Sequence, residues 1–429
     1  MNETRRVVSD VPCTVCGCVC DDLRLTIEDN RIVQAERACR LAEPWLLGQG
    51  QRRPPVAQIE GRTVALDEAL ARAAAILGSA RSPLIYGLSR SNTTGQRAAL
   101  ALAERLGATV DTTASRGHAP SILALQECGE STCTLGEVRN RADLVIFWGS
   151  DPVESHPRHL ERYALEATGL FVPQGRRDRQ LVVVDVKPTA TSALADRFVQ
   201  VQRGSDFDLL WALRGALRGI EPTEAVAGVP ADAVRALAES MRTCRCGMIF
   251  FGLGLARNGM RTVEALLRLG IDLNRHTRFY VRRMRVSGDV AGADSVLAWQ
   301  TGFPFAVNLG RNWPRYNPGE FTGPDMLARN EVDACLFVGG GGVRRFEPAA
   351  RAALAQVPTI LLDGPDAEPL FTPTVRFVTA VPGIHLAGTV YRMDEVPIEA
   401  RAVLSCGYPT DASLLGALQK RLTGQGKEP

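Results

Sequence analysis

The stretch DLVIFWG at residues 143–149 decides the fold class, because its apolar residues follow one another without polar interruption. Continuous apolar runs of this length are typical of parallel strands that are covered on both faces. Helical segments such as TGQRAALALAERLG (94–107) and RTVEALLRLGIDL (261–273) alternate with such runs. The other runs are PLIYG (83–87), QLVVVD (180–185), GMIFFG (247–252), DACLFVG (333–339) and PTILLD (358–363). The alternation predicts an α/β protein with parallel sheets.

The segments before the first run predict smaller elements. LRLTIEDNRIVQAE (23–36) alternates apolar and polar residues on both sides of Asp29-Asn30, which indicates a hairpin. VAQIEGRTVAL (56–66) has the pattern of a second, shorter hairpin. The next stretch has apolar residues at helical spacing, and we expect Asp67 to cap this helix.

Length and composition limit the class of protein. The 429 residues can bury a large core and form two or three domains. The chain is 45% apolar and 23% charged, with a formal net charge of +3, so neither a nucleic acid nor a membrane is an expected partner. The start MNETRRVVSD lacks the apolar core of a signal peptide, and no apolar run approaches the roughly 20 residues that span a bilayer. We therefore expect a cytoplasmic protein whose 11 cysteines stay reduced.

Four cysteines near the N-terminus, Cys13, Cys16, Cys20 and Cys39, form the main candidate site. The first three have the spacing C-x2-C-x3-C in VPCTVCGCVCDDLRL, and the fourth follows in ERACRLAE. Thiolates at this spacing can converge on one centre, which favours an iron–sulfur cluster over a structural zinc, since zinc more often pairs two C-x2-C knuckles. Four buried apolar thiols are the third alternative. Cys18 lies in the same run, and we expect it to be a spectator.

Glycine-rich turns and histidines are weaker candidates. GLGLARNG (252–259) and VGGGGVRRF (338–346) follow strands and could let a phosphate approach the backbone, but such glycines more often form simple tight turns. His156 and His159 in SHPRHLER could share a metal ion. No carboxylate stands at a matching helical spacing upstream, so a hydrogen-bonding structural role is favoured. His118, among small residues in TASRGHAPS, suits a loop that faces a cavity.

The cysteine segment and the segments after it resemble the molybdopterin oxidoreductase superfamily, and more closely the B subunit of formylmethanofuran dehydrogenase. The matching segments run in uninterrupted order from about residue 13 to residue 398. They are CDD (20–22), ACRL (38–41), PLIYG (83–87), TAS-x-x-H-x-PS-x-LALQ (113–126), TLGEVRNRAD (134–143), WG-x-x-P…HPRH (148–159), VVVD (182–185), AGVP (227–230), FFG-x-G (250–254), MR-x-x-x-x-VAG (284–292), RYNPGE (315–320) and G-x-x-YRM-x-x-VPI (388–398).

The resemblance implies a molybdopterin-oxidoreductase-like fold. This fold has two interleaved α/β units with parallel sheets and a small N-terminal cysteine-cage domain. The implied domains are 1–56 for the cysteine cage, 57–135 with 318–400 for the first α/β domain, 136–317 for the second α/β domain, and 401–429 for a C-terminal segment.

One position departs from the family in a way that bears on its chemistry. The family's loop TAS-x-C-H presents a cysteine or selenocysteine to tungsten or molybdenum, whereas this chain has Gly117 at that position. His118 and Arg285 match residues that flank the metal in the dehydrogenase. The stretch that reads SDPG in many relatives is GGGG at 339–342. Such losses resemble the B subunit of the bacterial formyltransferase/hydrolase complex, in which other subunits carry the chemistry.

This resemblance implies a subunit that serves the oxidation of formaldehyde to formate without redox chemistry of its own. Its partners would be the formyltransferase, amidohydrolase-like and further subunits of the complex, together with a furan-type formyl carrier. The four cysteines would hold a 4Fe–4S cluster or a structural zinc. Molybdopterin with tungsten or molybdenum would be absent, and His118 and Arg285 would be vestigial.

Two alternatives remain open. The first is an active B subunit of a tungsten or molybdenum formylmethanofuran dehydrogenase, which the four cysteines, His118 and Arg285 favour. Ser115 could then reach the metal in place of the missing ligand. The second is a stand-alone iron–sulfur electron carrier, which is disfavoured because a single cage offers an electron no relay within the chain.

Overall fold

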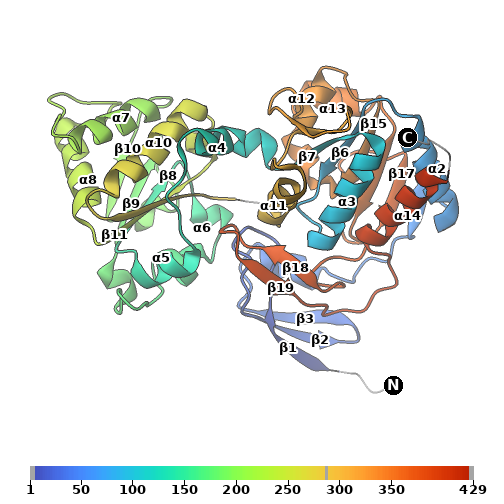
Figure 1. Cartoon of the computed structure of the whole chain (residues 1–429). Helices are drawn as coiled ribbons and strands as arrows, with labels where there is room; N and C mark the ends of the chain where they lie inside the picture. Colours follow the sequence, from blue (N-terminus) through green and yellow to red (C-terminus); the bar gives the residue numbers. More distant parts are fainter. Residues whose placement is uncertain (1–4, 286–287, 425–429) are drawn as a thin grey trace. The chain divides into compact units, whose positions relative to one another are not determined.

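The computed structural model describes residues 5–285 and 288–424 (Figure 1). Its contacts divide the chain into two units: Met1–Arg116 with Ser287–Pro429, and Gly117–Val286. These limits differ from the expected 136 and 317. The reason is that α4 (Ser115–Cys128) contributes Ala124 to the core of the second unit, whereas α11 (Val290–Thr301) contributes Leu297 to the core of the first. The cysteine segment belongs to the first unit.

The first unit is built on a nine-stranded sheet with the order β14-β13-β7-β6-β15-β16-β17-β4-β5. Its five central strands are parallel: β7 (Thr109–Thr112), β6 (Pro83–Gly87), β15 (Ala334–Val338), β16 (Thr359–Asp363) and β17 (Val375–Val378). Antiparallel strands extend both edges: β13 (Val307–Asn308), β14 (Arg315–Tyr316), β4 (Ala57–Ile59) and β5 (Arg62–Thr63). The central pair β6–β15 therefore joins segments that lie about 250 residues apart in the sequence.

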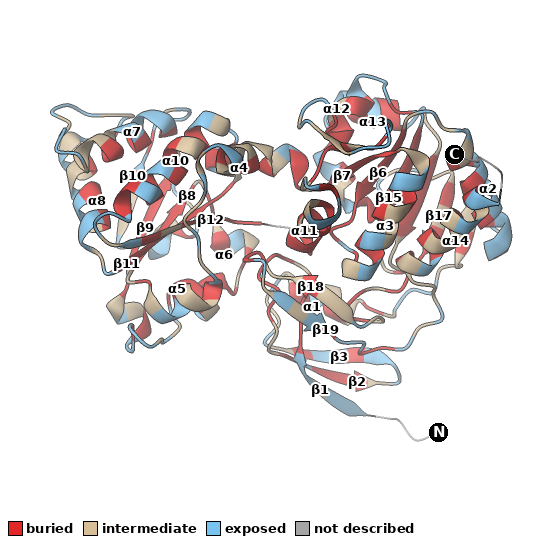
Figure 2. Cartoon of the chain, viewed as in Figure 1, coloured by how far each residue is buried: buried red, intermediate tan, exposed pale blue. Residues whose placement is uncertain are grey.

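Helices cover both faces of this sheet, so its central strands are buried (Figure 2). On one face, Ile85 and Leu336 pack into a core with Leu100 and Leu415 from the covering helices. On the other face, the backbone of Gly323 lies against the side chains of Leu84 and Tyr86, which alternate with Ile85 along β6. The first face carries α2 (Leu66–Ser79), α3 (Thr93–Leu106), α11 and α14 (Asp411–Thr423), and the second carries α12 (Gly323–Ala328), α13 (Pro348–Leu354) and the 3-10 helix η4 (Gly340–Arg345).

Small antiparallel elements complete the first unit. They are the sheet β1 (Arg6–Val11), β2 (Leu23–Glu28) and β3 (Arg31–Glu36), the helix α1 (Ala42–Leu47), and the hairpin β18 (Gly388–Tyr391) with β19 (Pro397–Ala400). The two hairpins predicted from the sequence are confirmed as β2–β3 and β4–β5. The predicted helix cap is wrong. α2 begins at Leu66 and its N-cap residue is Ala65, so Asp67 lies in the first turn, where its charge still favours the positive end of the helix dipole.

The second unit contains one five-stranded sheet in which all strands are parallel. Its order is β10 (Arg197–Gln200), β9 (Gln180–Asp185), β8 (Leu144–Trp148), β11 (Cys246–Phe251) and β12 (Arg278–Arg283). Its helices are α4, α5 (Leu135–Arg141), α6 (Pro152–Ser155), α7 (Asp206–Ala216), α8 (Ala231–Thr243), α9 (Leu253–Ala256) and α10 (Met260–Leu273), with short turns η1 (Leu160–Ala164), η2 (Gly175–Asp178) and η3 (Ser192–Leu194). All six apolar runs of the sequence are thus parallel strands, and the predicted α/β class with parallel sheets is confirmed.

Within residues 5–285 and 288–424, none of the helices combines the length and apolar character needed to cross a bilayer.

Gly247 should be one of the least replaceable residues of the second sheet. A Cβ atom at this position on β11 would lie 2.1 Å from the ring of Phe279, which is fully buried. We expect Gly247→Ala to lower the free energy of unfolding by about 2 kcal/mol, because overpacking a close-packed core displaces its neighbours. Gly416→Ala is the control, since Gly416 lies in α14 with open space around it and alanine should stabilise that helix by about 0.5–1 kcal/mol. Urea unfolding that ranks the two variants the other way would contradict this account.

Candidate functional site

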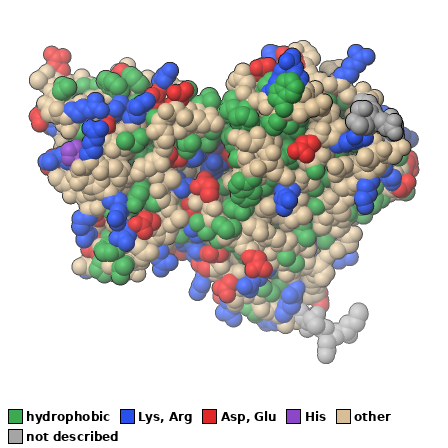
Figure 3. All heavy atoms as spheres, in the orientation of Figure 1, with side chains coloured by type: hydrophobic (Ala, Val, Ile, Leu, Met, Phe, Trp, Pro, Cys, Tyr) green, Lys and Arg blue, Asp and Glu red, His purple; other side chains and the backbone are tan. Residues whose placement is uncertain are grey.

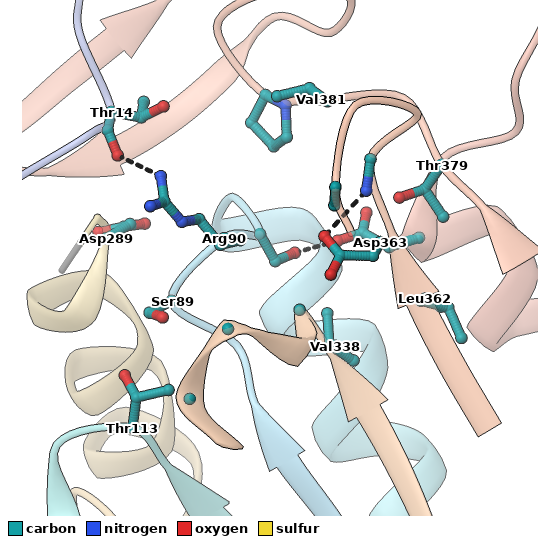
Figure 4. Close-up of a pocket in the computed structure, with 18 of the residues that line it drawn as sticks. Thr14, Ser89, Arg90, Thr113, Asp289, Val338, Leu362, Asp363, Thr379 and Val381 are labelled. Carbon is teal, nitrogen blue, oxygen red and sulfur yellow. Dashed lines mark hydrogen bonds between the residues drawn. The ribbon is translucent and has the colours of Figure 1, made fainter. Parts of the chain in front are cut away.

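A pocket of about 500 Å³ lies in the first unit, where the parallel strands reach their carboxyl ends (Figure 4). Ser89 and Arg90 follow β6, Gly339 follows β15, Asp363 ends β16 and Thr379 follows β17, and all five residues line the pocket. Ligands of open α/β sheets collect at this edge because side chains and loops from several strands meet there. The pocket is therefore the best candidate for a binding site in this unit.

Arg90 is one of the arginines that line the pocket, together with Arg344 and Arg345. The residue as a whole is exposed, but its side chain reaches into a partly buried contact, in which Nη1 donates a hydrogen bond to the carbonyl of Thr14, 3.1 Å away (Figure 4). Burial lowers the pKa of Arg90, while the negative charge of Asp363 opposes that shift. A guanidinium stays protonated in such surroundings, so Arg90 brings a permanent positive charge to the pocket. An anionic ligand group would complement it.

The glycine-rich turn after β15 lines the pocket next to Asp363. The amide of Gly340 donates to Asp363 Oδ2 and the amide of Gly364 donates to Oδ1, both at 3.0 Å. Burial raises the pKa of Asp363, while these hydrogen bonds and the charge of Arg90 oppose the shift. Gly339 has φ +85°, and a Cβ there would lie 3.2 Å from the Cβ of Arg90, so the turn requires glycine at this point. The predicted turn at 338–346 thus lines a pocket.

The cysteine segment adjoins this pocket through Thr14, which lies between Cys13 and Cys16. The segment is closed by two backbone hydrogen bonds, from Cys13 N to Cys20 O at 2.8 Å and from Val19 N to Cys16 O at 3.2 Å. Cys13, Cys16 and Cys20 are buried. The loop is therefore a compact structure that buries these three thiols.

The thiols of this loop influence one another. Burial raises the pKa of Cys13, and the thiols of Cys16, Cys20 and Cys39 raise it further. Hydrogen bonding with Cys18 lowers the pKa of Cys16, and the charge of Arg90 acts in the same direction. All four cysteines of the predicted cage are thus neighbours, but Cys18, expected to be a spectator, lies among them and bonds to the thiols of Cys16 and Cys20.

In donor chemistry, this group fits a thiolate-ligated cluster or zinc ion. In geometry, the residues that the structure describes include no three histidine, cysteine, aspartate or glutamate side chains grouped so that they could hold a metal ion. The four predicted ligands therefore share a neighbourhood without forming a preorganised metal site, and the predicted role of Cys13, Cys16, Cys20 and Cys39 stays a prediction.

Gly117, the position of the family's metal ligand, lies in α4 of the second unit. A Cβ built on Gly117 would lie 3.0 Å from Cδ2 of Leu253, which belongs to α9. Leu253 thus occupies the space beside the position from which a thiolate would project. A metal site that needs a side-chain ligand at 117 does not fit these residues.

His118 and Arg285 are both buried in the second unit. The carbonyl of Arg285 pairs with Nε2 of His156 at 2.7 Å, while Nδ1 of His156 lies 2.8 Å from the hydroxyl of Ser155. A neutral imidazole satisfies both contacts when Nε2–H donates to the carbonyl and Nδ1 accepts from the hydroxyl. His156 therefore fixes the backbone at Arg285, which agrees with the hydrogen-bonding role predicted for it.

His159 does not share that role. It is fully buried, and neither ring nitrogen has a hydrogen-bond partner among the described residues. Its ring meets Phe250 edge-on at 4.6 Å between centroids and lies 5.7 Å from Phe147 and 6.0 Å from Tyr163. The hydrogen-bonding role predicted for His159 is wrong, because the histidine lies in an aromatic core without a polar neighbour in reach of its nitrogens.

The glycine-rich turn at 252–259 serves close packing within the second unit. A Cβ at Gly252 or Gly254 would lie 2.4 Å or 2.7 Å from the carbonyl oxygen of Gly149. The turn after β11 thus crosses directly over the turn after β8. This close crossing accounts for the glycines, so no bound ligand is needed to explain them.

Sequence reasoning missed Arg90, Asp363 and Thr14. Arg90 and Asp363 stand at or directly after apolar strand runs, and this position is the signal that could have found them. Thr14 has no such signal, because it enters the pocket only through the fold of the cysteine loop.

Comparison with known proteins places the chain among subunits of one-carbon enzymes. No family model matches the chain. It is 39% identical over 434 residues to the B subunit of the tungsten-containing formylmethanofuran dehydrogenase 2 of Methanocaldococcus jannaschii, and the match covers 97% of this chain and 99% of the relative. It is 26% identical over 284 residues to the B subunit of the formyltransferase/hydrolase complex of Methylorubrum extorquens, and this match covers 66% of this chain and 74% of the relative.

A solved structure agrees with this relationship. The crystal structure of the formyltransferase/hydrolase complex from Methylorubrum extorquens, in complex with methylofuran, contains a chain that superposes with a TM-score of 0.73 at 25% identity. The superposition covers 87% of this chain and all of the other. The match over nearly the whole length to the dehydrogenase relative, together with this fold, confirms the predicted resemblance: the chain belongs to the family of formylmethanofuran dehydrogenase B subunits.

Proposed function

We propose that this chain is a non-redox scaffold subunit of a formyltransferase/hydrolase complex. The family relationship supports a role in the formyltransferase/hydrolase or formylmethanofuran dehydrogenase system. In the proposed complex, formyltransferase and amidohydrolase-like subunits release formate from a formyl group that a furan-type carrier moves between them. The proposal places this complex in the cytoplasm, where thiols stay reduced.

Gly117 is the single observation that carries the proposal. The protein controls a bound metal through its ligand and the groups around that ligand. At residue 117 there is no side chain, and Cδ2 of Leu253 lies 3.0 Å from the position that a Cβ would take. His118 and Arg285 are then structural remnants of a redox site.

We also propose that Cys13, Cys16, Cys20 and Cys39 hold an iron–sulfur cluster or a zinc ion as a structural crosslink. The burial of Cys13, Cys16 and Cys20, and the influence of all three other thiols on the pKa of Cys13, support this assignment. Such a group would tie the loop to α1 through Cys39, whose carbonyl accepts a hydrogen bond from the amide of Ala42, the first residue of that helix. Metal analysis should then find iron or zinc in the purified complex.

The test uses the complex purified through a tag on this chain. We expect tungsten and molybdenum far below one atom per chain, and no dye reduction by a formylated furan carrier. His118→Ala should leave formate release unchanged within about twofold, because His118 touches no reacting atom in a scaffold. Glu127→Ala, at an exposed position of the same helix, controls for effects on assembly.

One observation favours a second function, that of a working tungsten or molybdenum dehydrogenase. Identity to the tungsten-containing relative is higher and extends further than identity to the formyltransferase/hydrolase relative, 39% over 97% of the chain against 26% over 66%. Stoichiometric tungsten or molybdenum, with dye reduction that His118→Ala abolishes, would establish this function and refute the scaffold.

A further inference from the structure

Two apolar side chains stand exposed on the second unit at the side where its strands begin. Leu170 is 75% exposed and Phe171 is 44% exposed, and they form the Leu170–Phe171 tip of the loop between η1 and β9. Single exposed apolar residues are common on proteins, whereas contiguous apolar surface with a polar rim marks interaction sites. The surroundings of the tip decide which kind of site this is.

The tip is held rigidly. The amide of Phe171 donates to the carbonyl of Asn140 at 2.9 Å, and the amide of Leu170 donates to the Oδ1 of Asn140 at 3.3 Å. A Cβ at Gly169 would lie 2.2 Å from the carbonyl oxygen of Arg139, so the loop rests directly on the end of α5. Because its conformation is already fixed, the tip loses little entropy when a partner binds.

Arginines surround the tip. The guanidinium of Arg141 lies over the Phe171 ring, 4.1 Å from its centroid, and Nη2 of Arg245 lies 3.4 Å from the Phe171 carbonyl. Arg278 approaches Glu137 to 4.0 Å, the same carboxylate that pairs with Arg141 at 2.7 Å. The side chains of Arg245 and Arg278 are 66% and 50% exposed. Their charges therefore face solvent around an apolar centre.

The segments that lead into β8, β11 and β12, which include the ends of α5 and α8, carry an excess of positive charge. Residues 137–143, 239–245 and 275–278 contain six arginines and three carboxylates. Together with the tip they form what we call the basic face. Figure 3 shows Lys and Arg side chains next to hydrophobic ones on the lower part of this unit, with Asp and Glu side chains among them. Since the pocket-forming ends of parallel strands lie at the opposite edge, the basic face is separate from any strand-end site of this sheet.

We propose that the basic face docks a partner subunit through an acidic segment whose aliphatic or aromatic side chain packs on Leu170 and Phe171. This inference rests on the proposed function, which places the chain in a multi-subunit complex. Exposed ion pairs add little affinity, so the rigid apolar tip supplies the anchor and the arginines supply steering and register. The arrangement matches an interface with an apolar centre and a charged rim.

A nucleic acid is the competing occupant, and the observations favour the protein. A leucine that is 75% exposed cannot stack on a base, and the guanidinium of Arg141 already covers one face of the Phe171 ring. RNA binding is therefore the result that would count against a protein partner in the experiments below.

The first experiment uses the complex purified through a tag on this chain. A photoreactive benzoylphenylalanine at position 170 should crosslink to an acidic peptide of one partner subunit, identified by mass spectrometry. Leu170→Asp, and separately Arg275→Glu with Arg278→Glu, should lower the salt concentration at which that subunit dissociates by about twofold or more. Arg72→Glu changes an exposed arginine of α2 in the first unit and should have no effect. Crosslinks confined to this chain, with unchanged salt stability, would overturn the proposal.

The second experiment separates this inference from the proposed function. The full chain alone should bind a synthetic peptide of alternating glutamate and leucine about tenfold more tightly than a lysine–leucine peptide, and both sets of substitutions should remove that preference. If the acidic peptide binds but no other subunit co-purifies with the chain, the docking face is supported and the proposed complex is refuted. No preference for the acidic peptide, or tighter binding of a single-stranded RNA of equal charge, would refute the docking face.

Discussion

Acidification from pH 6.5 to pH 4 is expected to lower the free energy of unfolding of the second unit by about 6 kcal/mol through two buried histidines alone. Burial lowers the pKa of His156 to about 4, and it lowers the pKa of His159 to about 3, where the charge of His156 adds to the shift. Both groups titrate near 6.5 in the unfolded chain. The folded state therefore resists two protons that the unfolded state accepts.

The sign of the effect follows from proton counting. A basic group whose pKa is depressed by folding leaves stability intact above its unfolded value and removes stability as the pH falls below that value. Each unit of pH in this window costs about 1.4 kcal/mol per histidine, so each contributes about 3 kcal/mol between pH 6.5 and pH 4. At pH 7 and above, neither histidine contributes to the pH dependence.

Substitutions distinguish the two histidines from the carboxylates that also titrate on acidification. His159→Leu should roughly halve the loss between pH 6.5 and pH 4 and should cost little at pH 7, because no hydrogen bond to its ring nitrogens is removed. His156→Leu should cost about 2 kcal/mol at pH 7, because it leaves the Arg285 carbonyl and the Ser155 hydroxyl without this partner. His276→Gln, at an exposed position, is the control. Denaturant unfolding with the same pH slope in His159→Leu as in the parent would contradict the assignment.

The two histidines also illustrate how far sequence reasoning reaches. Local spacing favoured a structural role for both, and structure gives each a different one. The partner of His156 is a carbonyl 129 residues further along the chain, and the aromatic surroundings of His159 include Phe250 from β11. No local pattern contains such information, because it depends on which strand lies next to which.

The same limit explains which parts of the fold were predictable. A strand that is buried on both faces has a continuous apolar run, so six of the ten parallel strands among the described residues could be predicted from the sequence. The neighbour of β6 in the sheet could not be predicted from the sequence, because its partner β15 comes from a segment far along the chain. That pairing brings Arg90 beside Asp363 and creates the pocket. The cysteines were found because ligand spacing is local, whereas the position of Cys18 among them depends on the fold of the loop.

Arg179→Met is expected to be one of the most damaging single changes in the second unit, with a loss of about 3–5 kcal/mol in the free energy of unfolding. Arg179 is 4% exposed and lies between η2 and β9. Its guanidinium donates to four backbone carbonyls at 2.5–3.0 Å, those of Ala142, Leu165, Ala167 and Arg139. Burial lowers the pKa of Arg179, but the guanidinium stays charged, and charge-assisted hydrogen bonds of this kind are the stronger ones.

Methionine fills a similar volume but donates nothing, so the substitution leaves buried carbonyls without these partners. Lysine keeps the charge, but its three donors sit on one nitrogen. It cannot reach all the carbonyls that the planar guanidinium reaches from both sides. Arg179→Lys should therefore recover less than half of the loss in stability. Arg177→Met, two residues away and exposed, should change stability by less than about 0.5 kcal/mol.

Because two of the four carbonyls flank the loop that carries Leu170 and Phe171, Arg179→Met should also open that loop to limited proteolysis. A loss below about 1 kcal/mol with an intact loop would show that the carbonyls are satisfied without Arg179 and that the tip is held by Asn140 alone.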